Sequence, residues 1–97
     1  MLTIQQMMIF AAVCQEGTLQ KAADKLYLSQ SAVSKAIKEI TSQSGLKLFI
    51  LVGRRLQPTD AALRLLEDVN KVLVPYNTLQ QKLCLLYTSL HRNSAPP

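Results

Sequence analysis

Apolar residues recur at steps of three and four positions near the start of the chain, which is the spacing of a helix that buries one face. In residues 4–16 the pattern consists of Ile4, Met7, Phe10, Ala11, Val13 and Cys14. Thr3 precedes this stretch with the chemistry of an N-cap, since its hydroxyl can accept a hydrogen bond from the first turn. Gly17 follows it as a residue type that ends helices. The pattern therefore predicts a first helix over residues 4–16.

The same periodicity returns twice more before Gly45. Thr18 can cap a second, short helix whose apolar positions are Leu19, Ala22, Ala23 and Leu26. Ser29 can cap a third helix, which Gly45 would end. The buried side of this third helix is marked by Val33, Ala36, Ile37 and Ile40. Three helices are thus predicted before the pattern changes.

After Gly45 bulky apolar residues crowd too closely for one helix face. They are Leu46, Leu48, Phe49, Ile50, Leu51 and Val52. Gly53 and Pro58 interrupt the stretch, as turn residues do between strands. We expect a short β-hairpin with Gly53, Arg54 and Arg55 near its tip.

A fourth and much longer helix is predicted to start at Thr59 and Asp60. Its apolar positions form a heptad-like seam with one slip: Ala62, Leu66, Val69, Leu73, Tyr76, Leu79, Leu83, Leu86 and Leu90. The slip lies beside Pro75, which removes a backbone N–H, so we expect a kink or break near Val74. Residues 91–97 are polar and end in two prolines, which indicates a flexible tail.

A chain of 97 residues has room for one domain, which we place at residues 1–58, followed by the helix over 59–90 and the tail over 91–97. Lysine and arginine outnumber aspartate and glutamate by 11 to 6, a formal charge of +5. This excess favours a polyanionic partner, either nucleic acid or an anionic membrane surface. No apolar run approaches the ~20 residues of a membrane-spanning helix, and no basic segment opens the chain, so we expect neither a membrane anchor nor an export signal.

The second and third predicted helices, joined by a short turn, have the signature of a helix-turn-helix. Ala22 and Ala23 allow the two helices to approach closely, and the crossing angle is fixed by the apolar residues Leu26, Leu28, Val33 and Ala36. The outer face of the third helix then carries Gln30, Ser31, Ser34, Lys35 and Lys38. Such side chains suit a DNA major groove, because glutamine can bond adenine, lysine can reach guanine or phosphate, and serine permits close approach.

Taken alone, residues 30–38 are an ordinary solvated helix face, since lysine, glutamine and serine are common on any surface. The DNA-binding interpretation depends on the coincidence of the alanine pair, the apolar turn residue Leu28, the Ser29 cap and the basic hairpin tip. Tyr27 departs from the motif, because many such turns carry glycine at this position.

Residues 22–37, AADKLYLSQSAVSKAI, closely resemble the DNA-binding domain of LysR-type transcriptional regulators, whose pattern runs AAxxLxxSQxAVSxxI. The resemblance extends over residues 2–90. Before this stretch, Phe10, Val13 and Gly17-Thr18 resemble the end of the family's first helix. After it, Gly45-Leu46-x-Leu48-Phe49 resembles the family's LGxxLF motif. Arg54-Arg55 resembles the family's wing, and Pro58-Thr59 resembles the start of its linker helix.

The resemblance implies a mainly α-helical fold, a winged helix-turn-helix of three helices and a β-hairpin wing followed by a long linker and dimerisation helix. It implies that the third helix enters the major groove of double-stranded DNA, that a wing arginine enters the minor groove, and that two or more copies pair through the long helix. The candidate DNA contacts are Thr18, Gln20, Ser29, Gln30, Ser31, Ser34, Lys35, Lys38, Arg54 and Arg55. The candidate dimer contacts are Leu66, Val69, Leu73, Leu79, Leu83 and Leu86. We expect a bacterial cytoplasmic transcription regulator that needs no cofactor or metal.

Three positions depart from the family pattern: Leu51 stands where arginine is usual, Thr41 where glutamate is usual, and Ala62 where glycine is common. The family's large effector-binding domain has no counterpart in these 97 residues. The resemblance therefore implies a truncated or naturally short form without a small-molecule effector site.

An enzyme is disfavoured, because the only histidine, His91, lies in the expected tail and no Gly-rich loop follows a strand. The alternative to DNA binding is a protein-interaction module in which the leucine seam is the functional part and the helix-turn-helix a scaffold. A second copy could cover the seam, or the segment could fold back at Pro75 onto its own domain.

The two cysteines are interpreted as reduced thiols, since no Cys-x-x-Cys pair or histidine cluster accompanies them. Cys14 is predicted to be buried against the helix-turn-helix, because it shares a side of the first helix with Phe10 and Val13. Cys84, next to Leu83 in the seam, is predicted to be partly exposed or to lie close to its dimer mate, and to be labelled before Cys14.

Overall fold

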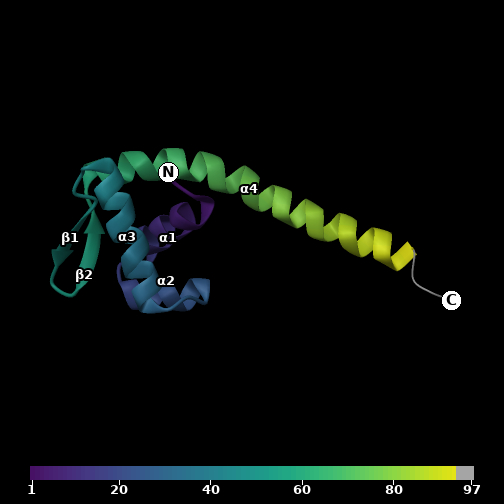
Figure 1. The fold of residues 1–97 in the computed structure, drawn as a ribbon, viewed down its shortest axis with the longest axis horizontal. Helices are drawn as coiled ribbons and strands as arrows, with labels where there is room; N and C mark the ends of the chain where they lie inside the picture. Colours follow the sequence, from purple (N-terminus) through teal and green to yellow (C-terminus); the bar gives the residue numbers. More distant parts are fainter. Residues whose placement is uncertain (94–97) are drawn as a thin grey trace.

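The computed structural model describes residues 1–93 (Figure 1). Its elements are α1 (Ile4–Glu16), α2 (Leu19–Leu26), α3 (Gln30–Ser44), β1 (Phe49–Val52), β2 (Arg55–Pro58) and α4 (Asp60–Asn93). The mainly α-helical winged helix-turn-helix predicted from the sequence is confirmed. Residues 94–97, part of the segment expected to be a flexible tail, lie outside the described residues, and the helix reaches three positions into that segment.

The predicted helix caps are present. The hydroxyls of Thr3, Thr18 and Ser29 each accept a hydrogen bond from the backbone N–H three residues on, at 3.1 Å in all three cases. Gly17 and Gly45 end α1 and α3 in the left-handed conformation. These local bonds satisfy backbone groups that a helix end leaves without partners, so they set the boundaries of the helix-turn-helix.

Tyr27 occupies the position where the sequence motif lacks its glycine. It ends α2 with φ 57°, and its side chain is 95% exposed. A left-handed backbone costs a residue with a Cβ about 1–2 kcal/mol. The turn therefore keeps the geometry that glycine would adopt more easily, because the surrounding helices impose it.

Two buried clusters hold the domain together, and α1 contributes to both. The first lies between α1, α2 and α3 and consists of Ile9, Ala12, Val13, Ala22, Ala23, Val33 and Ala36. The second joins α1 and α3 to the start of α4 and consists of Phe10, Ala11, Ile40, Leu48, Ala62, Val69 and Leu73. Ala22 and Ala23 of α2 and Ala36 of α3 are buried and small, which agrees with the close approach of the two helices predicted from the sequence.

The wing is a two-stranded antiparallel hairpin, in which Phe49 pairs with Pro58 and Val52 pairs with Arg55. This register leaves Gly53 and Arg54 as the turn, with Gly53 at φ 62°. The ring of Phe49 lies 5.7 Å from that of Phe10, centroid to centroid, so the base of the wing is anchored in the core.

A kink or a break was expected near Val74, and helix α4 continues through Pro75 without a break. Proline has no backbone N–H, so the carbonyl of Lys71 loses its partner in the helix. Lys71 and Pro75 are both exposed to water, which can replace that partner. Figure 1 shows the helix bending gently and leading away from the domain, which makes the molecule 60 Å long and 24 Å wide. The alternative in which the segment folds back at Pro75 onto its own domain is therefore wrong.

Cys14 is half-buried in contact with the second cluster, beside α4, and not against the helix-turn-helix as expected. Burial raises the pKa of its thiol to about 11. Cys84 is exposed, as predicted. Among residues 1–93, no helix is both long and apolar enough to cross a bilayer.

Candidate nucleic-acid interface

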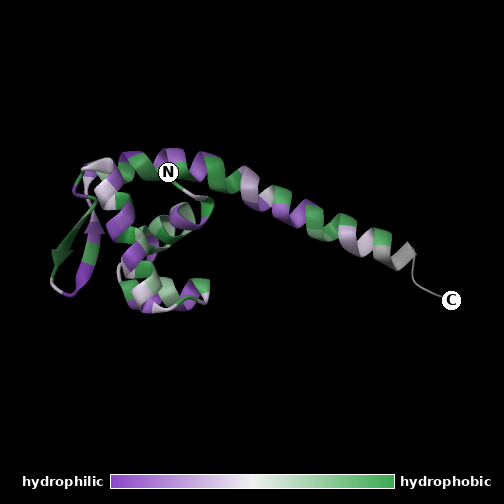
Figure 2. Ribbon diagram, viewed as in Figure 1, coloured by the Kyte–Doolittle hydropathy of each residue, from purple (hydrophilic) through white to green (hydrophobic). Residues whose placement is uncertain are grey.

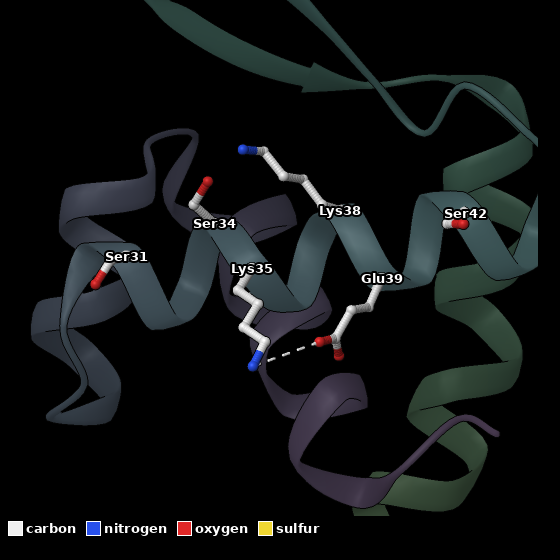
Figure 3. A pocket seen from close by; sticks show the side chains of 6 residues that line it. All are labelled: Ser31, Ser34, Lys35, Lys38, Glu39 and Ser42. Carbon is white, nitrogen blue, oxygen red and sulfur yellow. Dashed lines mark ion pairs between the residues drawn. The ribbon is translucent and has the colours of Figure 1, made fainter.

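The outer face of α3 presents a shallow hollow lined by serine and lysine side chains. Its lining residues are Ser31, Ser34, Lys35, Lys38, Glu39 and Ser42 (Figure 3). The opposite side of the helix is buried through Val33, Ala36 and Ile40. Because the buried side fixes the rotation of the helix, the polar residues lie together on the side that faces away from the core.

Of the residues predicted to lie on this face, Ser31, Ser34, Lys35 and Lys38 line the hollow, and Gln30 does not. Gln30, Ser31, Lys35 and Lys38 are exposed, and Ser34 is half-buried. Three serines and two lysines in one hollow offer small side chains that permit close approach and cations that can reach guanine acceptors or phosphates. This is the chemistry that a helix in a major groove requires.

Three predicted contacts near the starts of α2 and α3 have local partners. The hydroxyls of Thr18 and Ser29 serve as caps, and Gln20 Nε2 donates to Asp24 Oδ1 at 2.9 Å. The helix N-termini that these caps organise carry partial positive charge, which attracts phosphate. Thr18 and Ser29 therefore shape the N-terminal ends of α2 and α3, whereas Gln20 bonds within α2.

The two wing arginines differ in their surroundings. Arg55 Nη2 donates to the carbonyl of Glu16 at 3.3 Å, and its guanidinium lies over Gly17. The backbone N–H of Leu56 also donates to the carbonyl of Gly17, at 2.8 Å. Both arginines are exposed, but Arg55 ties β2 to the end of α1, whereas Arg54 lies in the turn at the tip of the wing.

Sequence reasoning did not include Glu39 in the site. Its Oε1 lies 4.0 Å from Lys35 Nζ, and its Oε2 accepts a hydrogen bond from Gln6 Nε2 at 2.9 Å. The spacing of four residues between Lys35 and Glu39 was a signal that could have pointed to the ion pair. The contact with Gln6 spans 33 positions, and no local pattern reports it.

The predicted dimer seam divides into two parts. Val69 and Leu73 are buried in the chain's own second cluster, and Leu66 packs against the same cluster. Leu79, Leu83 and Leu86 are 60–64% exposed on the part of α4 beyond the domain. Figure 2 shows hydrophobic positions continuing along this distal part of the helix.

A three-helix core with a wing and a polar, basic outer face on its third helix defines a winged helix-turn-helix domain. The chain belongs to the lysR family of bacterial regulatory helix-turn-helix proteins, whose model matches residues 4–63. The match runs from the first residue of α1 into the first turn of α4.

Similar proteins agree with this membership. The HTH-type transcriptional activator CmpR of Synechocystis sp. is 32% identical over 79 residues, which are 81% of this chain and 26% of CmpR. A probable transcriptional regulator from Pseudomonas aeruginosa superposes with a TM-score of 0.79 at 27% identity, over 84% of this chain and 28% of that one. The DNA-binding domain of CbnR, solved with DNA, has a TM-score of 0.74 at 22% identity, over 89% and 99% of the two chains. The chain spans about a quarter of the length of the curated relatives it matches.

Proposed function

We propose that this chain is the sequence-specific DNA-binding domain of a bacterial transcriptional regulator, with a recognition role and no catalytic one. The observation that carries the proposal is the outward face of α3, where exposed Lys35 and Lys38 stand among serines. The structure solved for the CbnR domain, which shares the fold, is a complex with DNA. Such a chain works where the bacterial chromosome lies, in the cytoplasm.

In this proposal α3 enters the major groove and the wing follows the adjacent minor groove. Lys35 reads a base edge, since it is an exposed cation among the residues that line the hollow (Figure 3). Lys38 and the helix ends capped by Thr18 and Ser29 contact phosphates. Arg54 enters the minor groove from the wing tip, because Arg55 is held against α1.

The proposal includes a homodimer formed through α4. Leu79, Leu83 and Leu86 are the residues that a second copy covers, since Val69 and Leu73 are already buried within one chain. Burying a leucine side chain contributes about 1.5–3 kcal/mol, far more than an exposed ion pair. A twofold dimer would bind half-sites separated by one helical turn of DNA, roughly 34 Å, or a multiple of it.

The test is selection of bound duplexes from a random pool, followed by titration of the selected duplex and a scrambled one. Lys35→Ala should weaken binding to the selected duplex by about 1–3 kcal/mol and relax the preference at one base pair. Equal weakening on every duplex would make Lys35 a phosphate contact. A chain that retards no duplex at any salt concentration would favour the protein-interaction module instead.

A further inference from the structure

A carboxylate stands at the edge of the face proposed to read DNA. Glu39 lines the same hollow as Lys35 and Lys38 (Figure 3). An acidic side chain is unfavourable next to a polyanion, because it repels the phosphates that supply most of the non-specific affinity. The position of Glu39 therefore calls for an explanation beyond solvation of a helix face.

The carboxylate is held from α1. Gln6 Nε2 donates to Glu39 Oε2 at 2.9 Å, while Gln6 Oε1 accepts from the backbone N–H of Thr3 at 3.0 Å. The second bond belongs to the capping box that starts α1, so it decides which end of the Gln6 amide points toward α3. Turning the amide over would break both bonds. The N-terminus of α1 thus orients one oxygen of Glu39.

The other oxygen faces Lys35. Glu39 Oε1 lies 4.0 Å from Lys35 Nζ, with the side chains 44% and 80% exposed (Figure 3). A pair this accessible to water shifts an equilibrium by about two- to fivefold. That is enough to bias the direction of the lysine side chain and too little to prevent it from moving to a better partner.

We propose that Glu39 is a specificity-determining residue that directs Lys35 toward the preferred base. On the preferred duplex Lys35 reaches the base acceptor without leaving the carboxylate, so the ion pair persists in the complex. On any other duplex Lys35 reaches only a phosphate and must turn away from the carboxylate, so the loss of the ion pair offsets the gain from the phosphate contact. Because specificity is a difference between two affinities, weakening the wrong complex is as effective as strengthening the right one. The inference rests on the proposed DNA-binding role of α3.

The experiment compares Glu39→Gln with the unmodified chain on a selected duplex and on a scrambled duplex of the same base composition. Glutamine keeps the length of the side chain and an oxygen for Gln6, and it removes the charge. Affinity for the scrambled duplex should rise about two- to fivefold more than affinity for the selected one. The plot of log affinity against log salt for the scrambled duplex should steepen by about one.

Two further variants isolate the cause. Glu67→Gln changes the net charge equally at an exposed site on α4 and should leave the ratio of the two affinities unchanged. In a Lys35→Gln background, Glu39→Gln should no longer alter that ratio, since its effect acts through the lysine.

The proposal is overturned if Glu39→Gln and Glu67→Gln act alike, because the effect would then be one of net charge. It is also overturned if Glu39→Gln lowers the thermal midpoint and leaves the affinity ratio intact, which would make the contact with Gln6 purely structural. Persistence of the effect without Lys35 would equally refute it. An unmodified chain that binds both duplexes equally would refute the DNA-recognition proposal itself, and this result is seen before any variant is made.

Discussion

Gly17 and Gly45 offer a matched pair for measuring how firmly the wing is tied to α1. Both end a helix in the left-handed conformation, with φ 77° and 67°. A Cβ added at Gly17 would lie 2.6 Å from Arg55 Nη2, whereas one added at Gly45 would meet nothing within 4 Å. Alanine at either position therefore strains the backbone similarly, but only alanine at Gly17 displaces Arg55.

The magnitudes follow from these contacts. The left-handed conformation costs alanine about 1–2 kcal/mol at either site. Gly17→Ala also removes the hydrogen bond from Arg55 to the carbonyl of Glu16, and with it a cation at the C-terminal end of α1, whose last turn has no basic residue. An exposed bond of this kind, together with its helix-dipole interaction, contributes about 0.5–1 kcal/mol. We expect Gly17→Ala to be the more destabilising variant by this amount.

Urea unfolding followed by circular dichroism measures both free energies of unfolding. In an Arg55→Ala background the difference between the two variants should vanish, because no guanidinium remains to be displaced. Equal losses for Gly17→Ala and Gly45→Ala in the unmodified chain would refute the role of Arg55 as a tie between the wing and α1.

Three other predictions concern separate parts of the molecule. Tyr27→Gly should raise the free energy of unfolding by about 0.5–1 kcal/mol, since the relief of left-handed strain exceeds the added freedom of the unfolded chain; a loss in urea unfolding would contradict this. Iodoacetamide should modify Cys84 before Cys14. The rate at which Cys14 is alkylated should rise about tenfold per pH unit until the pH approaches the Cys14 pKa of about 11. The stability associated with the protonated Cys14 thiol is complete below pH 9.0 and declines as pH rises toward 11, because the folded-state pKa is the higher one. Leu79→Asp should raise the dimer dissociation constant at least tenfold in sedimentation experiments, because each chain loses about 1.5–3 kcal/mol of leucine burial. Gln81→Asp, on another side of α4, should leave the dissociation constant unchanged. A monomer mass for the unmodified chain would rule out this interface.

The helix-turn-helix could be predicted from the sequence because its signals are local. A hydroxyl at Thr18 or Ser29 meets a backbone N–H three residues on, and a glycine at position 17 or 45 ends the helix in which it lies. These interactions connect neighbours in the chain, so spacing alone reports them. The outward face of α3 follows from the same periodicity, since residues that share a helix face recur every three or four positions.

The long helix shows where such reasoning stops. Its seam of apolar residues looks uniform along the sequence, yet the structure buries Val69 and Leu73 against α1 and leaves Leu79 and Leu83 in water. The periodicity of a helix indicates which residues share a face. It does not indicate how far along the helix the rest of the domain extends to cover that face. Pro75 likewise marks a lost hydrogen bond, but only the exposure of that turn explains why the helix continues.

The order of the helices, their caps, the wing and the resemblance to the family could therefore all be read from local patterns in the sequence. Two features became visible only in the folded protein: Arg55, and not Arg54, ties the wing to α1, and Gln6 orients Glu39 beside Lys35. The reason is the distance along the chain. Arg55 meets Glu16 across 39 positions and Gln6 meets Glu39 across 33, so each pair exists only because the packed core has already placed its two elements side by side.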